Sequence, residues 1–381
     1  MSRILILHAA VGLGHQRAAE ALGRAFSLRR AARVCVEDTL EHGSAFFRHL
    51  YARSYLELSE KVPALWAYFY QRADENETQL SQALRLLVDQ IGVTELDALL
   101  ARYQPDAIVC THFLPVDLLV ERRHRGLATP PLFCVVTDFT GHVFWAYPGV
   151  DGYFVAAPLT SQMLTQRGVP ADRITVTGIP VDPAIAEPKD RYQVRQAYEI
   201  GPGAVITLFG GGLAVARVRQ IVTDLLDRDL PGTLIVVAGR NAGLVNALQG
   251  MPRTQRLKLR LFGFVDVVDD LVTASDLVLT KAGGMIVSEV LARGRPLVLV
   301  DPIPGQEEWN ADYVVSVSAG VQVRLGAMVS VVVENLINHP AHRQLLEAGA
   351  AAAGHPEAAF AIADAVLARL GSSLGTQPGQ G

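Results

Sequence analysis

Short apolar runs alternate along the chain with longer segments of helical pattern. A first series of runs covers 3–8, 33–37, 107–111, 132–137, 152–155 and 174–177. A second series covers 205–209, 233–238, 259–262, 277–280 and 296–300. Apolar strands that alternate with helices are typical of parallel sheets covered by helices on both faces. The pattern therefore predicts an α/β protein with two doubly wound, Rossmann-like sheets.

The segment between the two series, 182–203, is rich in proline, glycine and charge. A chain of 381 residues is long for a single core, so this segment is interpreted as an interdomain linker. We expect one domain at 1–181, a second at 204–370 and a disordered tail at 371–381. Ligands of such sheets bind beyond the carboxyl ends of the strands, so two sheets facing each other would form a cleft with the active site in it.

Composition narrows the class of protein. The net charge is −4 and half of the residues are apolar, a balance that gives no support to nucleic-acid binding. Cys35, Cys110 and Cys134 lie far apart and are expected to be buried thiols in a reducing compartment, not metal ligands or disulfides. No apolar stretch is long enough to span a bilayer, and the N-terminal apolar run is too short for a signal peptide. The chain is expected to be cytoplasmic, at most bound to a membrane surface.

A glycine turn follows the run at 277–280. Gly283 and Gly284 allow the backbone to approach a ligand, and the first amides of the next helix favour an anion such as a diphosphate. Glu289 falls about one and a half turns into that helix, where its carboxylate can accept hydrogen bonds from a ribose. A polar loop at 304–310 follows the next strand. This order predicts a sugar-nucleotide site.

A second glycine loop follows the first strand. Gly12 and Gly14 begin a dinucleotide-binding pattern, but Arg17 occupies its third glycine position, so the nicotinamide reading is weak. His15 stands at the start of the next helix, where an imidazole can accept a proton from an acceptor hydroxyl. A capping or merely exposed histidine is the alternative.

Another polar cluster ends the run at 132–137. Asp138 and His142 are expected at the same rim as His15, with Trp145 close behind them in the sequence. A catalytic carboxylate and a structural cap are both open for Asp138.

An aromatic and basic segment spans 44–72. Tyr51 and Tyr55 follow helical spacing and Trp66 lies further along, a pattern that suits domain core or a helix in the lipid headgroup region. A basic cluster at 122–125 suits anionic lipid or a solvated turn. We expect part of the aromatic stripe to be core and its edges to contact a membrane.

Taken together, these motifs resemble those of the monogalactosyl- and processive diacylglycerol glycosyltransferases. These are inverting GT-B enzymes related to the transferase that adds N-acetylglucosamine to lipid I. The resemblance runs from Leu5 to about Leu370, and its motifs are specific in combination. They lie at 11–15, 137–139 with Trp145, 176–181, 210–212, 239–241, 281–289 and 304–310.

The resemblance implies a role for each matching position. His15 would be the general base, with Asp138 as a second candidate catalytic residue. Residues with implied donor contacts are Gly14, Gly211, Gly212, Arg240, Asn241, Phe264, Val265, Gly283, Gly284, Met285, Glu289, Gln306, Glu307 and Asn310. Within this set the glycines would hold the diphosphate, and Glu289 the ribose. The turn at 262–265 would meet uracil, and Gln306 and Glu307 the hexose, with Asn310 supporting them. Residues with implied acceptor or membrane contacts are Tyr51, Tyr55, Trp66, His142 and Trp145.

One departure from the family pattern puts some of these contacts in doubt. The triple glycine continues as Leu213-Ala214-Val215-Ala216 where the family has further glycines, and Arg217 or Arg219 could compensate. No Asp-x-Asp motif in the chain suggests a metal-bridged diphosphate, so the implied transfer uses no metal or other cofactor. The implied substrates are a UDP-hexose and a diacylglycerol-type lipid on an anionic membrane, reached from the inner face of the cell membrane. Glucose and galactose both remain open as the hexose.

Three alternatives remain. A UDP-sugar 2-epimerase shares the architecture and would isomerise its substrate without an acceptor. A lipid I-type N-acetylglucosaminyltransferase is a closer rival, against which the aromatic segment at 44–72 counts. A nucleotide-sugar sensor would bind UDP-sugar without transfer.

Overall fold

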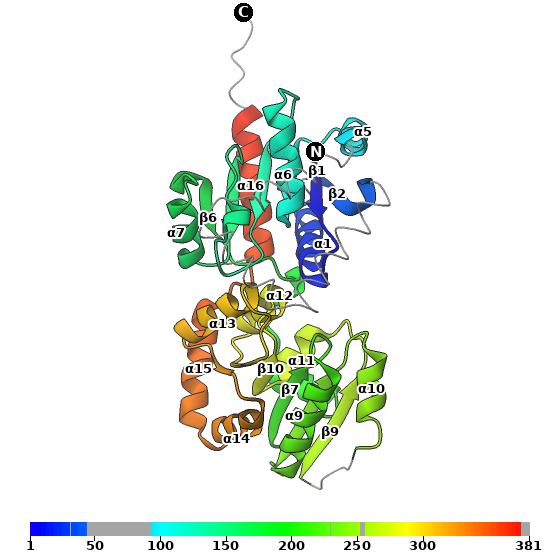
Figure 1. Ribbon diagram of the computed structural model, residues 1–381, viewed down its shortest axis with the longest axis vertical. Coiled ribbons are helices and arrows are strands. Elements are labelled where there is room, and N and C mark those ends of the chain that lie inside the picture. Colours follow the sequence, from blue (N-terminus) through cyan, green and yellow to red (C-terminus); the bar gives the residue numbers. More distant parts are fainter. Residues whose placement is uncertain (31, 44–92, 229, 252–255, 375–381) are drawn as a thin grey trace, which may run out of the picture. The chain divides into compact units, whose positions relative to one another are not determined.

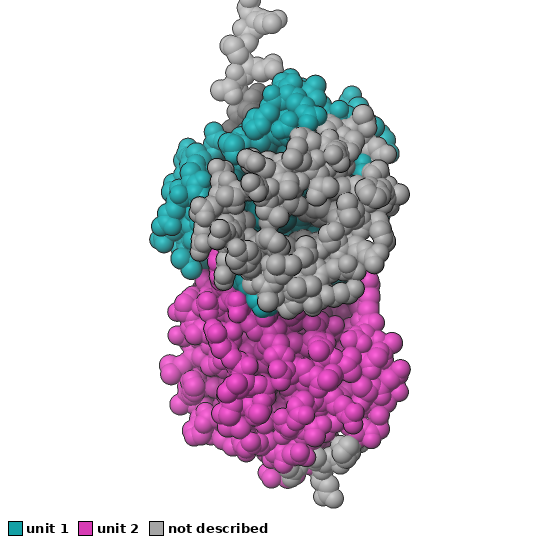
Figure 2. All heavy atoms as spheres, in the orientation of Figure 1, with its two compact units in different colours: residues 1–186, 304–306, 357–381 teal, residues 187–303, 307–356 magenta. Residues whose placement is uncertain are grey.

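The computed structural model describes residues 1–30, 32–43, 93–228, 230–251 and 256–374. The chain folds into two compact units (Figure 2). Unit 1 comprises 1–186, 304–306 and 357–381, and unit 2 comprises 187–303 and 307–356. Each unit contains one six-stranded parallel sheet, which confirms the predicted α/β class with two Rossmann-like sheets (Figure 1).

In unit 1 the strand order is β2-β1-β3-β4-β5-β6. Its strands are β1 (Ser2–His8), β2 (Ala32–Asp38), β3 (Ala107–Cys110), β4 (Leu132–Val135), β5 (Gly152–Val155) and β6 (Ile174–Val176). Its helices are α1 (Leu13–Leu28), α5 (Val93–Tyr103), α6 (Phe113–His124), α7 (Pro158–Gln166) and α16 (Ala358–Leu374). Short 3₁₀ turns are η1 (Thr39–His42), η3 (Val143–Trp145), η4 (Ala171–Arg173) and η5 (Pro183–Ala186).

In unit 2 the order is β12-β11-β10-β7-β8-β9. Its strands are β7 (Ala204–Phe209), β8 (Gly232–Val237), β9 (Leu257–Phe262), β10 (Leu277–Thr280), β11 (Leu297–Val300) and β12 (Gly320–Val323). Its helices are α8 (Arg191–Ala197), α9 (Val215–Asp227), α10 (Ala242–Leu248), α11 (Val268–Ala274), α12 (Gly284–Ala292), α13 (Gln306–Ser316, its first residue in unit 1), α14 (Val329–Asn338) and α15 (Pro340–Ala353), with the turn η6 (Gly326–Met328).

Alternate side chains of the unit 1 strands pack into two separate hydrophobic cores. Leu5 and Leu7 of β1 pack with residues of α5 and α6, whereas Ile4 and Ile6 pack with residues of α1 and α16. This alternation follows from the two-residue period of a strand and explains why the runs are apolar throughout. The sheet is therefore buried on both faces.

Helix α16 belongs to unit 1, where it packs on α1 and the sheet through Ile362 and Val366, both fully buried. Residues 358–370 were expected in the second domain and the tail was expected from 371, whereas the helix continues to Leu374. The boundary between the units after Ala186 falls inside the expected linker at 182–203. The rest of that linker contains α8.

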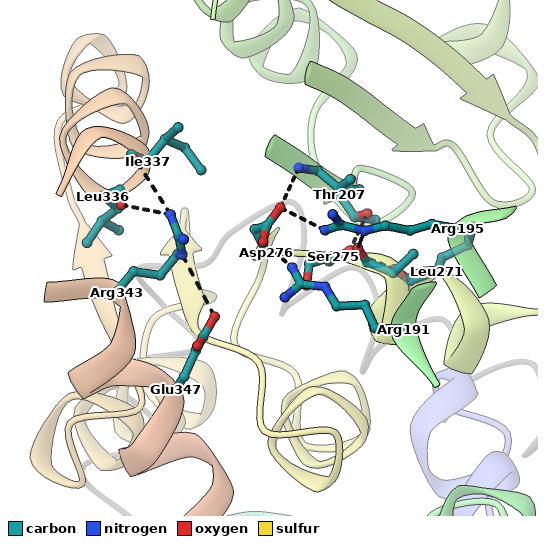
Figure 3. A network of polar contacts seen from close by, with 12 residues as sticks. Arg191, Arg195, Thr207, Leu271, Ser275, Asp276, Leu336, Ile337, Arg343 and Glu347 are labelled. Atoms are coloured by element: carbon teal, nitrogen blue, oxygen red, sulfur yellow. Dashed lines mark hydrogen bonds and ion pairs between the residues drawn. The ribbon is translucent and has the colours of Figure 1, made fainter. Parts of the chain in front are cut away.

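Helix α8 is anchored within unit 2 by Asp276, the residue directly before β10 (Figure 3). Asp276 accepts hydrogen bonds from the Val205 amide at 2.7 Å and from Arg195 Nη2 at 2.8 Å, and it also pairs with Arg191. Burial alone would raise the pKa of Asp276, but Arg191, the Val205 amide and Arg195 outweigh it and lower the pKa. This carboxylate is therefore a charged anchor for the segment that was expected to be only a linker.

Eleven predicted strands agree with the structure to within two residues at each end. Strand β12 was missed. None of the described helices is long and apolar enough to cross a membrane.

Candidate active site

In unit 1 the strand order reverses between β1 and β3, so ligands are expected beyond the carboxyl ends of these two strands. The loop after β1 leads into α1 through Gly12, whose φ of 138° favours glycine. Helix α1 begins at Leu13 and places His15 in its first turn. The structure thus puts His15 at the switch point of the sheet.

His15 is held by the ends of two neighbouring strands. Its Nδ1 lies 2.9 Å from the Thr111 carbonyl oxygen and 2.9 Å from Thr137 Oγ1, while Thr111 Oγ1 donates to the His15 carbonyl at 2.9 Å. A carbonyl oxygen can only accept, so Nδ1 carries the hydrogen and Nε2 keeps its lone pair. Burial lowers the pKa of His15 to about 4. The ring is therefore neutral at pH 7, with Nε2 as the basic atom.

A second histidine, which the sequence analysis missed, lies against His15. His112 is fully buried, follows β3 directly, and caps α6 by accepting the Leu114 amide at Nδ1, 3.0 Å away. The two imidazole rings meet edge to face, with centroids 4.5 Å apart and planes at 82°. The available signal was the polar pair Thr111-His112 directly after a strand that neighbours the first one.

Asp138 is buried at the end of the β4 loop. Its Oδ1 accepts a hydrogen bond from Gln306 Nε2 at 2.7 Å, and both residues belong to unit 1. A contact between an expected catalytic residue and an expected hexose-binding residue brings two of the predicted site residues together. The role of each stays a prediction.

His142 and Trp145 are both buried. His142 Nδ1 accepts the Phe144 amide at 3.2 Å, and the Trp145 ring centroid lies 6.4 Å from that of His15. Their implied acceptor contact stays a prediction, since both side chains are enclosed by protein here. Tyr51, Tyr55 and Trp66 lie outside the described residues.

Unit 2 has the corresponding switch point between β7 and β10. The triple glycine follows β7, and a Cβ added to Gly211 would lie 3.0 Å from the Ala238 carbonyl oxygen. A Cβ added to Gly212 would lie 3.6 Å from Lys281 Cδ, so the loops after β7 and β10 approach each other. Two glycine loops at the carboxyl ends of neighbouring strands form a cradle of the kind that binds phosphate.

The loop after β10 is braced by α13. Asn310, which is buried, donates from Nδ2 to the Ala282 carbonyl at 3.0 Å. Glu307 Oε2 accepts the Ile303 amide at 2.7 Å and lies 3.5 Å from Lys281 Nζ. These contacts support the glycine turn at the start of α12.

Helix α12 carries two further residues of the predicted donor site. Met285 and Glu289 are both buried on it, and Gly283 and Gly284 form its N-terminal turn. The structure thus joins these four residues with Glu307 and Asn310 at one end of the unit 2 sheet. Contact with a nucleotide sugar stays a prediction for all of them.

The loops after β8 and β9 contain four further predicted donor residues, whereas Gly14 lies in the first turn of α1 in unit 1. The Arg240 guanidinium lies over the Phe264 ring, 5.0 Å from its centroid, and Phe264 is 56% exposed. Asn241 caps α10 by accepting the Leu244 amide at 3.0 Å, while Val265 packs against the core. The Asn241 side chain therefore has a structural task that the sequence analysis did not foresee.

Arg217, suggested as compensation for the shortened glycine run, is engaged elsewhere. Its Nε lies 2.5 Å from Asp301 Oδ2 in an ion pair. Among the described residues, no group of three or more His, Cys, Asp or Glu side chains could hold a metal ion.

Models of two known protein families match this chain. The monogalactosyldiacylglycerol (MGDG) synthase model matches residues 15–181, and the model of the glycosyltransferase family 28 C-terminal domain matches residues 205–361. Between them the two models match most of the chain. The chain belongs to the glycosyltransferases of the monogalactosyldiacylglycerol synthase type.

Relatives of this family align over nearly the full length. The chain is 27% identical over 338 residues to the processive diacylglycerol β-glucosyltransferase of Bacillus pumilus, covering 88% of this chain and 86% of the relative. It is 27% identical over 373 residues to the enzyme of the same name from Bacillus cereus strain B4264, covering 96% and 93%.

Solved structures show the same GT-B fold. MurG of Acinetobacter baumannii superposes with a TM-score of 0.62 at 16% identity, covering 97% of this chain and 100% of that one. UDP-GlcNAc 2-epimerase of Neisseria meningitidis, bound to UDP-GlcNAc, superposes with a TM-score of 0.60 at 13% identity, covering 96% and 100%. The fold is thus common to transferases and epimerases and does not separate them.

Proposed function

We propose that this protein is an inverting glycosyltransferase that moves glucose or galactose from a UDP-sugar to diacylglycerol or a similar membrane lipid. The observation that carries the proposal is the contact of His15 Nδ1 with the Thr111 carbonyl oxygen at the switch point of unit 1, which leaves the lone pair of the neutral ring on Nε2. This unit is the one that resembles MGDG synthase. The relatives named as diacylglycerol glucosyltransferases support the same substrate class.

In this mechanism the hydroxyl oxygen of the lipid attacks the anomeric carbon of the UDP-α-hexose. Its proton passes to His15 Nε2, a bond forms between that oxygen and the anomeric carbon, and the bond from the anomeric carbon to the β-phosphate oxygen breaks. UDP leaves with the electron pair of the broken bond. Attack opposite to the leaving group gives a β-glycoside.

The leaving diphosphate needs stabilisation as its charge grows. Backbone amides at Gly211, Gly212 and the start of α12 are suited to this role, because helix N-termini and glycine loops present unpaired donors. We propose that these groups suffice without a metal ion. Glu289 is assigned to the ribose, and Gln306 and Glu307 to the hexose.

The acceptor is proposed to reach the protein at an anionic membrane surface on the inner face of the cell membrane. This part of the proposal rests on the resemblance, because Arg122, Arg123 and Arg125 at the end of α6 pair with Asp97, Asp151 and Glu121.

The epimerase alternative shares the fold but not the acceptor, and the full-length relatives favour transfer. The test uses radiolabelled UDP-glucose and UDP-galactose in separate tubes, each with and without diacylglycerol in anionic micelles. Label that enters the organic phase only with diacylglycerol supports the proposal and names the sugar. A label that stays in water, with isomerisation of the UDP-sugar in the absence of lipid, would establish the epimerase instead.

A further inference from the structure

His112 has a position that the proposed reaction leaves unexplained. Its side chain is fully buried directly after β3, and its Nδ1 is occupied as acceptor of the Leu114 amide at 3.0 Å. The hydrogen of the neutral ring therefore sits on Nε2. Among the described residues this buried Nε2 has no hydrogen-bond partner. A buried donor without an acceptor lowers stability, so the histidine must contribute something that a fully satisfied side chain would not.

The surroundings of the His112 ring identify that contribution. One neighbour is the His15 ring, edge to face at a centroid distance of 4.5 Å, and another is Phe113, with its centroid 4.1 Å away and planes at 32°. Among the described residues, the hydrogen bonds of the His15 ring are at Nδ1. The imidazole is rigid, so rotation about its Cβ–Cγ bond moves both nitrogens together, and these hydrogen bonds restrain the direction of Nε2 as well. Contact with the His112 ring adds a second restraint on the same rotation.

We propose that His112 is a positioning residue for His15, holding the ring plane so that Nε2 points at the acceptor hydroxyl. The inference rests on the proposed function, in which His15 Nε2 takes the proton. A single histidine side chain meets two demands at this place, since it caps α6 and packs against His15. Asparagine would keep the cap without the ring, and phenylalanine would keep a ring without the cap.

Among the described residues, the titratable group that acts on both rings is a third histidine. His8 on β1 acts on both rings, and burial lowers the pKa of His8, His15 and His112 alike. Asp38, Glu20, Glu41 and Glu37 act on His8 in the opposite direction. Removal of the His112 ring would admit water next to His15 and relieve the burial that lowers its pKa. The pKa of His15 should then rise toward its ordinary value.

The test compares His112→Asn, His112→Phe and His342→Asn in the full-length protein. His342 is exposed on α15 of unit 2 and is the control. With the transferred UDP-sugar and dioleoylglycerol in phosphatidylglycerol micelles, we expect H112N to lower kcat about 10- to 100-fold, the range that a misplaced group costs. KM for the UDP-sugar should stay unchanged. H112F should keep kcat within about threefold of wild type while Tm falls, and H342N should match wild type in both.

A second readout needs no acceptor and separates this inference from the proposed function. NMR titration of the His15 ring should give a higher pKa in H112N than in wild type, with H112F close to wild type. Failure of all variants and wild type to glycosylate lipid would refute the proposed function, and the titration would still decide the positioning role. An unchanged His15 titration in H112N, or an H112F that loses as much activity as H112N, would overturn the inference. If H112N does not fold, retention of activity and titration by H112F supports the role, and their loss overturns it.

Discussion

At the residue scale, the chemistry depends on which nitrogen of His15 carries the hydrogen. The Thr111 carbonyl assigns it to Nδ1, 2.9 Å away, and leaves Nε2 with the lone pair that the proposed base role requires. The sequence predicted the position of His15 from the glycine loop before it. It could not predict the tautomer, because Thr111 and Thr137 follow strands β3 and β4 and lie 96 and 122 residues further along the chain.

The pH dependence of turnover follows from that state. Burial lowers the pKa of His15 to about 4, and only the neutral ring can act as base. The rate should therefore be retained through pH 6 and fall only as the pH drops through about 4. The profile of kcat/KM checks this, since it reports the free enzyme, and UDP-sugar binding measured at each pH serves as the control. An acid limb near the ordinary histidine value of about 6.5 would contradict the assignment.

A glycine substitution tests the phosphate cradle. In Gly211→Ala the new Cβ would lie 3.0 Å from the Ala238 carbonyl oxygen, so the loop must shift. Strain of this kind costs about 1–3 kcal/mol, and its effect on donor binding should be about tenfold or more in Kd for UDP. Gly201→Ala is the control, because nothing lies within 4 Å of its added Cβ. Calorimetric titration with UDP gives the Kd of each variant. Equal affinities in the two variants would show that Gly211 does not contribute to diphosphate binding.

At the scale of elements, the apolar runs were sufficient to place eleven strands, because strands buried on both faces are apolar throughout. Strand β12 was not predicted because it is short, begins with Gly320 and carries Gln322 at the sheet edge. The loops that join these strands were predictable as glycine turns. The side chains that hold these loops in place were not predictable. Asn310, for example, donates to the Ala282 carbonyl from α13, and nothing in the sequence indicates this contact.

The anchor of α8 gives a stability prediction. Asp276→Asn removes the charge that pairs with Arg191 and Arg195, whose side chains are 23% and 16% exposed. Breaking a mostly buried pair of this kind should lower the free energy of unfolding by about 2–4 kcal/mol at pH 7. Asp364→Asn is the control, because Arg29 and Asp364 are 40% and 53% exposed and their pair should contribute at most about 1 kcal/mol.

The same anchor predicts a pH effect of definite sign. The pKa of Asp276 is lowered in the folded state, so its contribution is present above the unfolded value of about 3.9 and is lost as the pH falls through the folded value. Urea unfolding of wild type and D276N should therefore converge below about pH 4. A gap that stays constant to pH 2 would show that the lost stability is not electrostatic.

At the scale of the whole molecule, the chain returns to unit 1 with its last helix. The sequence could not reveal this return, because α16 has an apolar stripe that would suit either unit. Only the packing of Ile362 and Val366 on the unit 1 sheet assigns it.

Hydrogen exchange tests this assignment. Ile362→Ala should cost about 2–5 kcal/mol, as for other fully buried side chains, and should reduce protection of amides in β1 and β3 while leaving β7 and β10 unchanged. Leu336→Ala, in the core of unit 2, should give the reverse pattern. Equal loss of protection in both sheets for each variant would contradict two separately packed units.

In the proposed function, unit 2 binds the UDP-sugar and His15 of unit 1 activates the lipid hydroxyl. The most direct measurement compares wild type with His15→Ala for transfer of labelled hexose to diacylglycerol and for UDP-sugar affinity on the same preparations. The account predicts that kcat falls about 10²–10⁴-fold, the range for a general base, while the affinity stays within about twofold. Unchanged transfer in H15A, or an equal loss of transfer and binding, would contradict it.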